Sequence, residues 1–160
     1  MSELPVWVAE PAEAATVARL LVAFRDSMGY DWPSDNAFLA GVEKLIEDRK
    51  TTAYLLGAPD PDSPPGAVAQ LRFRHGLWRA GPDCLLEDLF VEEAARGRGL
   101  GRAMTEFAMT YAREERGARR MELDVNEANE PAVSLYESLG FGVKNRHGGR
   151  DLYLRVNFDD

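Results

Sequence analysis

The chain has 160 residues, of which 45% are hydrophobic and 29% are charged, the composition of an ordinary globular domain. Its formal net charge of −8 argues against a nucleic-acid partner, and no apolar run is long enough to span a membrane. We expect a single domain over residues 1–160, with neither a secretory signal nor a membrane partner. The lone Cys84 cannot form an internal disulfide, so we expect a cytoplasmic location.

Hydrophobic periodicity and turn residues divide the chain into short strands and helices. In chain order we expect a strand at 6–9, a helix from Pro11 to near Gly29, a second helix capped by Ser34, strands at 51–56, 67–73 and 84–91, a helix from Leu100 to Gly117, a strand at 121–125, a short helix capped by Asn129, and a hairpin of 141–143 with 151–156. This order, β-α-α-β-β-β-α-β-α-β-β, predicts an α/β fold without internal repeats.

A glycine-rich turn, Arg-Gly-Arg-Gly-Leu-Gly-Arg at 96–102, joins a predicted strand to a predicted helix. Glycines let a ligand approach the backbone, and the first N–H groups of a helix are unpaired and lie at the positive end of its dipole. This combination favours a phosphate or pyrophosphate ligand. The spacing fits neither the dinucleotide fingerprint Gly-x-Gly-x-x-Gly nor the Walker loop, because Arg102 stands where each needs a glycine.

The turn matches the pyrophosphate loop of the GNAT acetyltransferases, Arg/Gln-x-x-Gly-x-Gly/Ala, as Arg96-x-x-Gly99-x-Gly101. A stretch that resembles the second signature of this family follows at 129–141, and the run Leu-Glu-Asp-Leu-Phe-Val at 86–91 resembles the spermidine/spermine (diamine) acetyltransferase-like branch. The resemblance covers roughly residues 66–158, whereas the first third fits only in element order. It implies a GNAT fold: a mixed central β-sheet that is splayed between strands 4 and 5, with helices on both faces.

The resemblance further implies an acetyl-CoA-dependent N-acetyltransferase (an acyltransferase) in which a primary amine attacks directly within a ternary complex. Acetyl-CoA would be the co-substrate, and no metal is expected, because His75 and His147 lack metal-ligand spacing with Cys84. Carried over position by position, the cofactor-binding residues would be Leu89, Phe90, Val91, Arg96, Gly97, Arg98, Gly99, Leu100, Gly101, Arg102, Asn129 and Ser134.

Two residues are candidates for catalysis. Glu87 would serve the acceptor amine, the amine that receives the acetyl group. Because a free glutamate and an alkylammonium differ by roughly six pKa units, a water relay, or burial that narrows this gap, is more reasonable than direct abstraction. Tyr136 occupies the family's tyrosine position and would stabilise the departing thiolate. Side chains alternate along a strand, so only one of Glu87 and Asp88 can face the cleft unless a bulge intervenes. The alternative for Glu87 is a solvated pair with Asp88 at the end of the strand. The alternative for Tyr136 is a side chain that packs in the core.

The acceptor amine is expected to be small and cationic, such as a polyamine, because residues 1–95 carry 8 basic and 16 acidic side chains. Asp31, Trp32 and Trp78 would line its pocket together with Glu87. An amino acid, an antibiotic or a protein amine stays open as the acceptor. A different class of function, an acyl-CoA-binding sensor or interaction module without turnover, is also open. Members of the family often dimerise, so a homodimer is a further expectation.

Overall fold

The computed structural model describes residues 4–159, and the chain divides into two compact units, one ending at Leu123 and the other beginning at Asp124. The strands are β1 Val6–Val8, β2 Thr52–Gly57, β3 Ala67–Gly76, β4 Gly81–Val91 and β5 Arg120–Glu122. The helices are α1 Ala14–Ser27, α2 Asp35–Ile46, α3 Leu100–Thr110, which continues as a π-helical turn Tyr111–Glu115, and α4 Glu130–Ser138, with 3₁₀ turns at Pro11–Glu13, Leu77–Arg79 and Glu93–Ala95. None of the described helices is both long and apolar enough to cross a membrane.

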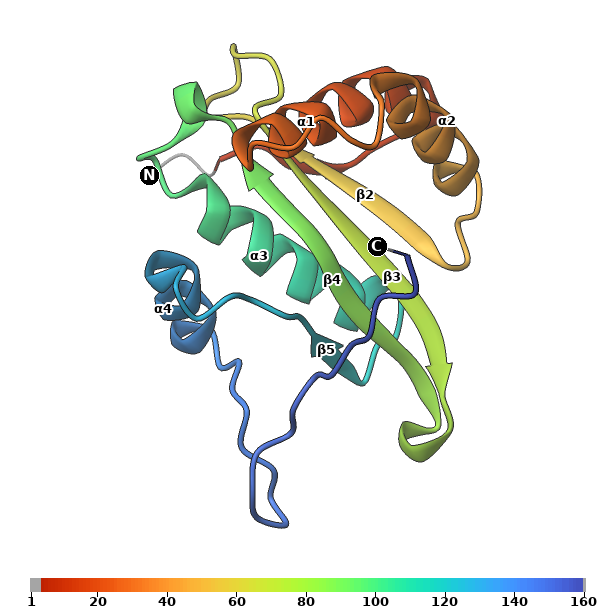
Figure 1. Cartoon of the computed structure of the whole chain (residues 1–160), viewed down its shortest axis with the longest axis vertical. Helices are drawn as coiled ribbons and strands as arrows, with labels where there is room; N and C mark the ends of the chain where they lie inside the picture. Colours follow the sequence, from red (N-terminus) through yellow and green to blue (C-terminus); the bar gives the residue numbers. More distant parts are fainter. Residues whose placement is uncertain (1–3, 160) are drawn as a thin grey trace. The chain divides into compact units, whose positions relative to one another are not determined.

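The first unit is built on one sheet in which the strands lie in the order β1-β2-β3-β4-β5 (Figure 1). Neighbouring strands are antiparallel except for β4 and β5, which are parallel. The β5 ladder reaches only Asp83–Leu85 of β4, so residues 86–91 of β4 have no strand partner on that side among the described residues. This is the predicted mixed sheet with its opening between strands 4 and 5, which confirms the predicted fold class.

Helices cover both faces of this sheet. Helices α1 and α2 lie on one face, where Leu20 and Val42 share a core with Leu56, Val68 and Phe90 from three strands (Figure 1). Helix α3 packs on the opposite face, so closely that a Cβ atom at Gly57 of β2 would lie 2.6 Å from the Met104 sulfur. Because successive side chains along a strand point to opposite faces of the sheet, each strand contributes side chains both to the face under α1 and α2 and to the face under α3.

Two predicted helix caps are present. Ser34 Oγ accepts a hydrogen bond from the Ala37 N–H at 3.1 Å at the start of α2. Asn129 Oδ1 accepts one from the Ala132 N–H at 3.3 Å at the start of α4. Both side chains satisfy an N–H group that a helix leaves unpaired at its first turn.

The prediction of a closing hairpin was wrong. In the second unit, residues 141–159 form only an isolated bridge between Lys144 and Arg150, and the apolar Leu152 and Leu154 are exposed. The described part of this unit contains no other strand against which two short strands could pair, and an isolated two-stranded ribbon is marginal. The predicted strand at 121–125 also ends early, at Glu122, whereas β3 and β4 are longer than predicted because their ladder runs to a tight turn at Gly76 and Gly81.

Candidate active site

The glycine-rich turn ends in an open helix terminus. Gly97 and Gly99 both have φ of +81°, a left-handed conformation that glycine adopts without steric penalty. Gly99 is the N-cap of α3, and no side chain caps that helix. The N–H groups of its first turn, which includes Leu100 and Gly101, are therefore available to an anion at the positive end of the helix dipole.

Arg96 is tied to the end of β4. Its Nε donates to the Val91 carbonyl at 2.9 Å, and its guanidinium lies 5.9 Å from the centre of the Phe90 ring. Phe90 is itself stacked on Phe24 of α1, with ring centres 5.0 Å apart. The start of the turn is thus fixed to the core of the sheet.

The other two arginines of the turn pair with exposed acids. Arg98 lies 3.5 Å from Asp60, whose pKa is lowered, chiefly by a hydrogen bond from the Ser63 hydroxyl. Arg102 lies 3.3 Å from Glu106, one helical turn further along α3. Exposed pairs of this kind contribute little free energy, so the Arg98 guanidinium can turn toward an incoming phosphate at small cost.

The strand end before the turn is anchored to a neighbouring loop and to α1. The Glu92 N–H donates to the Gly66 carbonyl at 2.8 Å, and the Glu92 carboxylate pairs with Arg19 at 2.6 Å. A Cβ atom at Gly66 would lie 2.8 Å from the Ala95 Cβ, so only glycine allows this approach. These contacts hold β4 and the turn in a fixed relation.

A β-bulge in β4 displays two carboxylates on one face of the sheet. Gln70 of β3 is opposite Asp88, but the next residue, Leu71, is opposite Leu86, so Glu87 is an extra residue without a β3 partner. Asp88 shares its face with Phe90, two residues on, which belongs to the core under α1 and α2. Glu87 pairs with Arg72 at 2.7 Å, and Arg72 shares the face of Gln70, so Glu87 and Asp88 both face the side of α1 and α2.

Tyr54 belongs to the same group of side chains. It is opposite Gln70 in the β2–β3 ladder, and burial raises its pKa to about 12, with smaller effects from the charges of Arg72, Glu87 and Asp88. Its hydroxyl therefore stays protonated at physiological pH. Tyr54, Gln70 and Arg72 were absent from the sequence predictions. The available signal was weak: three polar residues that interrupt otherwise apolar strands.

The second unit carries Asn129, Ser134 and Tyr136. Asn129 caps α4 and is exposed, as is Ser134. Tyr136 is half-buried, and its ring meets Phe141 edge-on with ring centres 5.8 Å apart. Burial raises the pKa of Tyr136, so the hydroxyl keeps its proton throughout the physiological range and can act as a hydrogen-bond donor.

The predicted acceptor-pocket residues are exposed. Asp31 and Trp32 lie on the connector between α1 and α2, and the side chain of Trp32 is 78% exposed. Trp78 is fully exposed at the tip of the β3–β4 hairpin. Glu87 lies six residues beyond the first residue of β4, about 20 Å along the strand at roughly 3.3 Å per residue. A small amine held at Glu87 is therefore out of reach of Trp78.

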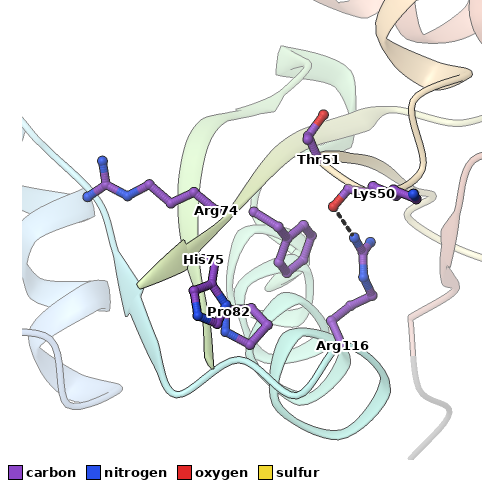
Figure 2. A pocket seen from close by; sticks show the side chains of 7 residues that line it. Lys50, Thr51, Arg74, His75, Pro82 and Arg116 are labelled. Carbon is purple, nitrogen blue, oxygen red and sulfur yellow. Dashed lines mark hydrogen bonds between the residues drawn. The ribbon is translucent and has the colours of Figure 1, made fainter. Parts of the chain in front are cut away.

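A pocket of about 300 Å³ lies at the end of the sheet remote from the glycine-rich turn (Figure 2). Arg116 is one of the residues that line this pocket. Its guanidinium stacks 3.9 Å from the centre of the Phe73 ring and donates to the carbonyls of Arg49 and Lys50. Figure 2 shows the side chains of Lys50 and Arg74 extending away from this pocket. None of the predicted site residues lines it. Arg116 therefore connects the end of the π-helical turn at 111–115 to β3 and to the loop before β2, and it is not one of the predicted site residues.

Cys84 is buried on the α3 side of β4, and burial raises the pKa of its thiol to about 12. Only the thiolate reacts with alkylating reagents, so we expect the native protein to react with iodoacetamide at neutral pH about three orders of magnitude more slowly than a free thiol. Mass spectrometry of native and urea-unfolded protein checks this. Native labelling as fast as unfolded labelling would contradict the buried position.

Comparison with known proteins adds a family match over most of the chain. The family model described as "Acetyltransferase (GNAT) family" matches residues 17–141. The peptidyl-lysine N-acetyltransferase YjaB of Salmonella typhimurium is 31% identical over 118 residues, which cover 73% of this chain and 70% of that protein. A mycothiol acetyltransferase of Salinispora tropica is 46% identical over 59 residues, but the matched part is 37% of this chain and only 19% of that protein.

Solved structures show the same fold. A protein of Arthrobacter sp. FB24 is 29% identical and superposes with a TM-score of 0.86, over 99% of this chain and 98% of the other. An aminoglycoside N-acetyltransferase solved in complex with CoA has a TM-score of 0.71 at 20% identity, over 98% of this chain and 96% of the other. At that identity the likeness concerns the fold alone. Among the residues described here, no group of three or more His, Cys, Asp or Glu side chains is arranged to hold a metal ion.

Proposed function

Because the chain belongs to the Acetyltransferase (GNAT) family, we propose that it transfers the acetyl group of acetyl-CoA to a primary amine. The observation that carries the proposal is the pairing of two features on one strand. The bulge at Glu87 presents two carboxylates to an amine. Strand β4 ends four residues later, at Val91, and the glycine-rich turn, which fits a pyrophosphate, begins at Arg96. An amine and a phosphate-bearing acyl carrier are the two substrates that this arrangement fits.

The residues around the turn fit acetyl-CoA. Gly97 and Gly99 leave the backbone N–H groups at the start of α3 accessible to a pyrophosphate, and Arg98 and Arg102 add positive charge. The part of β4 from 86 to 91 that β5 leaves unpaired, which contains Leu89 and Val91, has backbone groups that can pair with the amides of the pantetheine arm. Acetyl-CoA supplies the activated thioester.

For the chemical step we propose direct attack of the amine nitrogen on the acetyl carbonyl carbon, followed by cleavage of the carbon–sulfur bond. The proton of the ammonium leaves toward Glu87, directly or through one water molecule. Arg72 holds Glu87 Oε2 at 2.7 Å, while Oε1 has no hydrogen-bond partner within residues 4–159. The Leu89 N–H would stabilise the developing oxyanion, and the Tyr136 hydroxyl the departing thiolate. Asn129 and Ser134 remain candidates for binding the pantetheine arm.

We propose a small cationic amine as the acceptor, because the bulge in β4 places two carboxylates, Glu87 and Asp88, on one face of the sheet. Asp31 and Trp32 would contribute from the α1–α2 connector. YjaB, by its name, acts on peptidyl-lysine, whose side-chain amine is also cationic. The spermidine/spermine-like segment at 86–91 makes a polyamine one candidate, and amino acids, antibiotics and protein amines are others.

A panel of amines tests the proposed function. Purified protein with acetyl-CoA should release free CoA thiol in the presence of cationic amines and form the N-acetylated amine in equal amount. Neutral and anionic amines should be poorer substrates. If acetyl-CoA binds and no amine of any charge is acetylated, the chain is instead a sensor or interaction module that binds acyl-CoA without turnover.

Replacement of Glu87 by glutamine should lower kcat/KM at neutral pH by about 10² or more, because it removes the group that receives the proton of the amine. Activity should recover partly as the pH rises and the free amine becomes abundant. The measurement is the pH profile of kcat/KM at saturating acetyl-CoA.

Glu122→Gln is the matched control. It removes the same charge from a carboxylate of similar exposure, 39% against 37%, that also pairs with an arginine, Arg120 at 3.1 Å. Glu122 lies on β5, so this variant should keep the wild-type profile. A Glu87→Gln variant with the wild-type pH profile would rule out Glu87 as the proton acceptor.

A further inference from the structure

Two charged side chains of the proposed site are joined by a single hydrogen bond. Arg72 of β3 (Ala67–Gly76) donates from Nε to Glu87 Oε2 of β4 (Gly81–Val91) at 2.7 Å. Within residues 4–159 neither side chain makes another hydrogen bond or ion pair. The bond therefore leaves Glu87 Oε1 and both terminal nitrogens of Arg72, Nη1 and Nη2, without a protein partner.

These unpaired atoms are accessible. The Arg72 side chain is 42% exposed and that of Glu87 is 37% exposed. Among the described residues, the unpaired side-chain nitrogen and oxygen atoms that are buried belong to Gln70 and Asp83. Neither Nη atom of Arg72 is one of them, so a ligand can reach both from solvent.

The pair offers a donor surface and an acceptor atom side by side. Glu87 Oε1 accepts hydrogen bonds, whereas Nη1 and Nη2 of Arg72 together carry four N–H donors. Because Nε is bonded to Glu87, the two Nη groups are left to meet a carboxylate end-on, in the two-pronged geometry that guanidinium groups favour. Asp88, the second carboxylate of the bulge, has interactions of its own within the protein.

The charges of Arg72 and Glu87 cancel, but their directions do not. A ligand with an ammonium group alone would meet Glu87 and leave the Nη groups of Arg72 in water. A ligand that carries a carboxylate close to its ammonium group would match both side chains, with each charge opposite its counterpart. Charge-assisted hydrogen bonds of this kind are about twice as strong as neutral ones.

We propose that the acceptor is an amino acid whose reacting α-amine lies at Glu87 Oε1 and whose carboxylate is bound by Nη1 and Nη2 of Arg72. The inference rests on the proposed function and narrows its substrate class. Combined with the cationic acceptor proposed above, it selects basic α-amino acids such as lysine or ornithine over simple alkyl diamines. Arg72 is then a residue that determines specificity.

Lysine and cadaverine test the inference, because the two molecules differ only by the α-carboxylate. We expect wild-type kcat/KM to favour lysine by about tenfold to a hundredfold, and the acetyl group to be placed on the α-nitrogen. Arg72→Met removes the donors, so the lysine-to-cadaverine ratio should fall to about one or below. The loss of the hydrogen bond to Glu87 slows both substrates alike, so the ratio isolates recognition of the carboxylate.

Arg74→Met is the matched control. Arg74 lies two residues further along β3, its side chain is 78% exposed, and it pairs with Glu122 at 3.8 Å, so this variant should keep the wild-type ratio. Acetyl-CoA affinity should be unchanged in both variants.

The contrary outcomes separate the two proposals. Wild-type acetylation on the ε-nitrogen of lysine, a wild-type preference for cadaverine, or an unchanged ratio in Arg72→Met would overturn the role of Arg72 and leave the proposed function standing. The first two outcomes need only the wild-type protein, so the test does not depend on the folding of a variant. Acetyl-CoA binding with acetylation of no amine at all would reject the proposed function, and this inference with it.

Discussion

Tyr136→Phe is expected to lower kcat by about 10²–10⁴, the range for a positioned proton donor, with acetyl-CoA affinity unchanged. The substitution keeps the ring, so the edge-on contact with Phe141 at 5.8 Å survives. Because burial raises the pKa of Tyr136, the wild-type hydroxyl keeps its proton from pH 6 to 9, and the loss should be nearly constant over that range. Steady-state kinetics at several pH values measures it.

The raised pKa also decides what the hydroxyl does. A thiol near pKa 8.5 is a stronger acid than this tyrosine, so a strong hydrogen bond to the departing sulfur is favoured over complete proton transfer. Tyr153→Phe is the control, since it removes a hydroxyl from an exposed tyrosine of the same unit. Wild-type turnover by Tyr136→Phe would return Tyr136 to a packing role.

Gly99→Val is expected to weaken acetyl-CoA binding by about a hundredfold or more. Gly99 has φ of +81° at the N-cap of α3, so a branched side chain there both strains the backbone and covers the N–H groups that a pyrophosphate would meet. Loss of one or two such charge-assisted hydrogen bonds, at about 1.5–3 kcal/mol each, accounts for the magnitude. Isothermal titration calorimetry measures the affinity.

Gly117→Val separates strain from binding. Gly117 has φ of +70°, and a Cβ atom at Gly117 or at Gly99 meets no atom within 4 Å, so both variants carry comparable backbone strain. Gly117 follows the π-helical turn at the other end of the α3 segment. Both variants should lose similar stability, but only Gly99→Val should lose affinity. Equal acetyl-CoA affinity in the two variants would contradict the pyrophosphate assignment.

Features that depend on neighbouring residues in the chain were predictable from the sequence. Ser34 and Asn129 cap helices where a polar side chain precedes an apolar repeat, and Gly99 ends a strand and opens a helix as its motif indicates. In each case, a few consecutive residues determine the hydrogen bonds and the backbone angles.

Features that depend on register between strands were not predictable. The bulge at Glu87 exists because β3 and β4 shift by one residue between Gln70 and Leu71, and no local pattern at Glu87 encodes that shift. Without the register, Glu87 and Asp88 were expected on opposite faces, and the alignment of Gln70 with Tyr54 and Asp88 could not be seen. The hairpin at 141–156 failed for a related reason, because alternation predicts a strand but cannot supply its partner.

The central claim, that the carboxylates at the bulge in β4 receive an amine which takes the acetyl group directly from acetyl-CoA, is tested most directly by one measurement. Wild-type protein and Glu87→Gln are each mixed with acetyl-CoA and the amines of the panel, and free CoA and N-acetyl product are quantified together by mass spectrometry. We predict equal amounts of CoA and N-acetyl product from the wild type, and a rate about 10² lower from the variant at neutral pH. Acetyl-CoA binding without N-acetyl product, or equal rates from both proteins, would contradict the account.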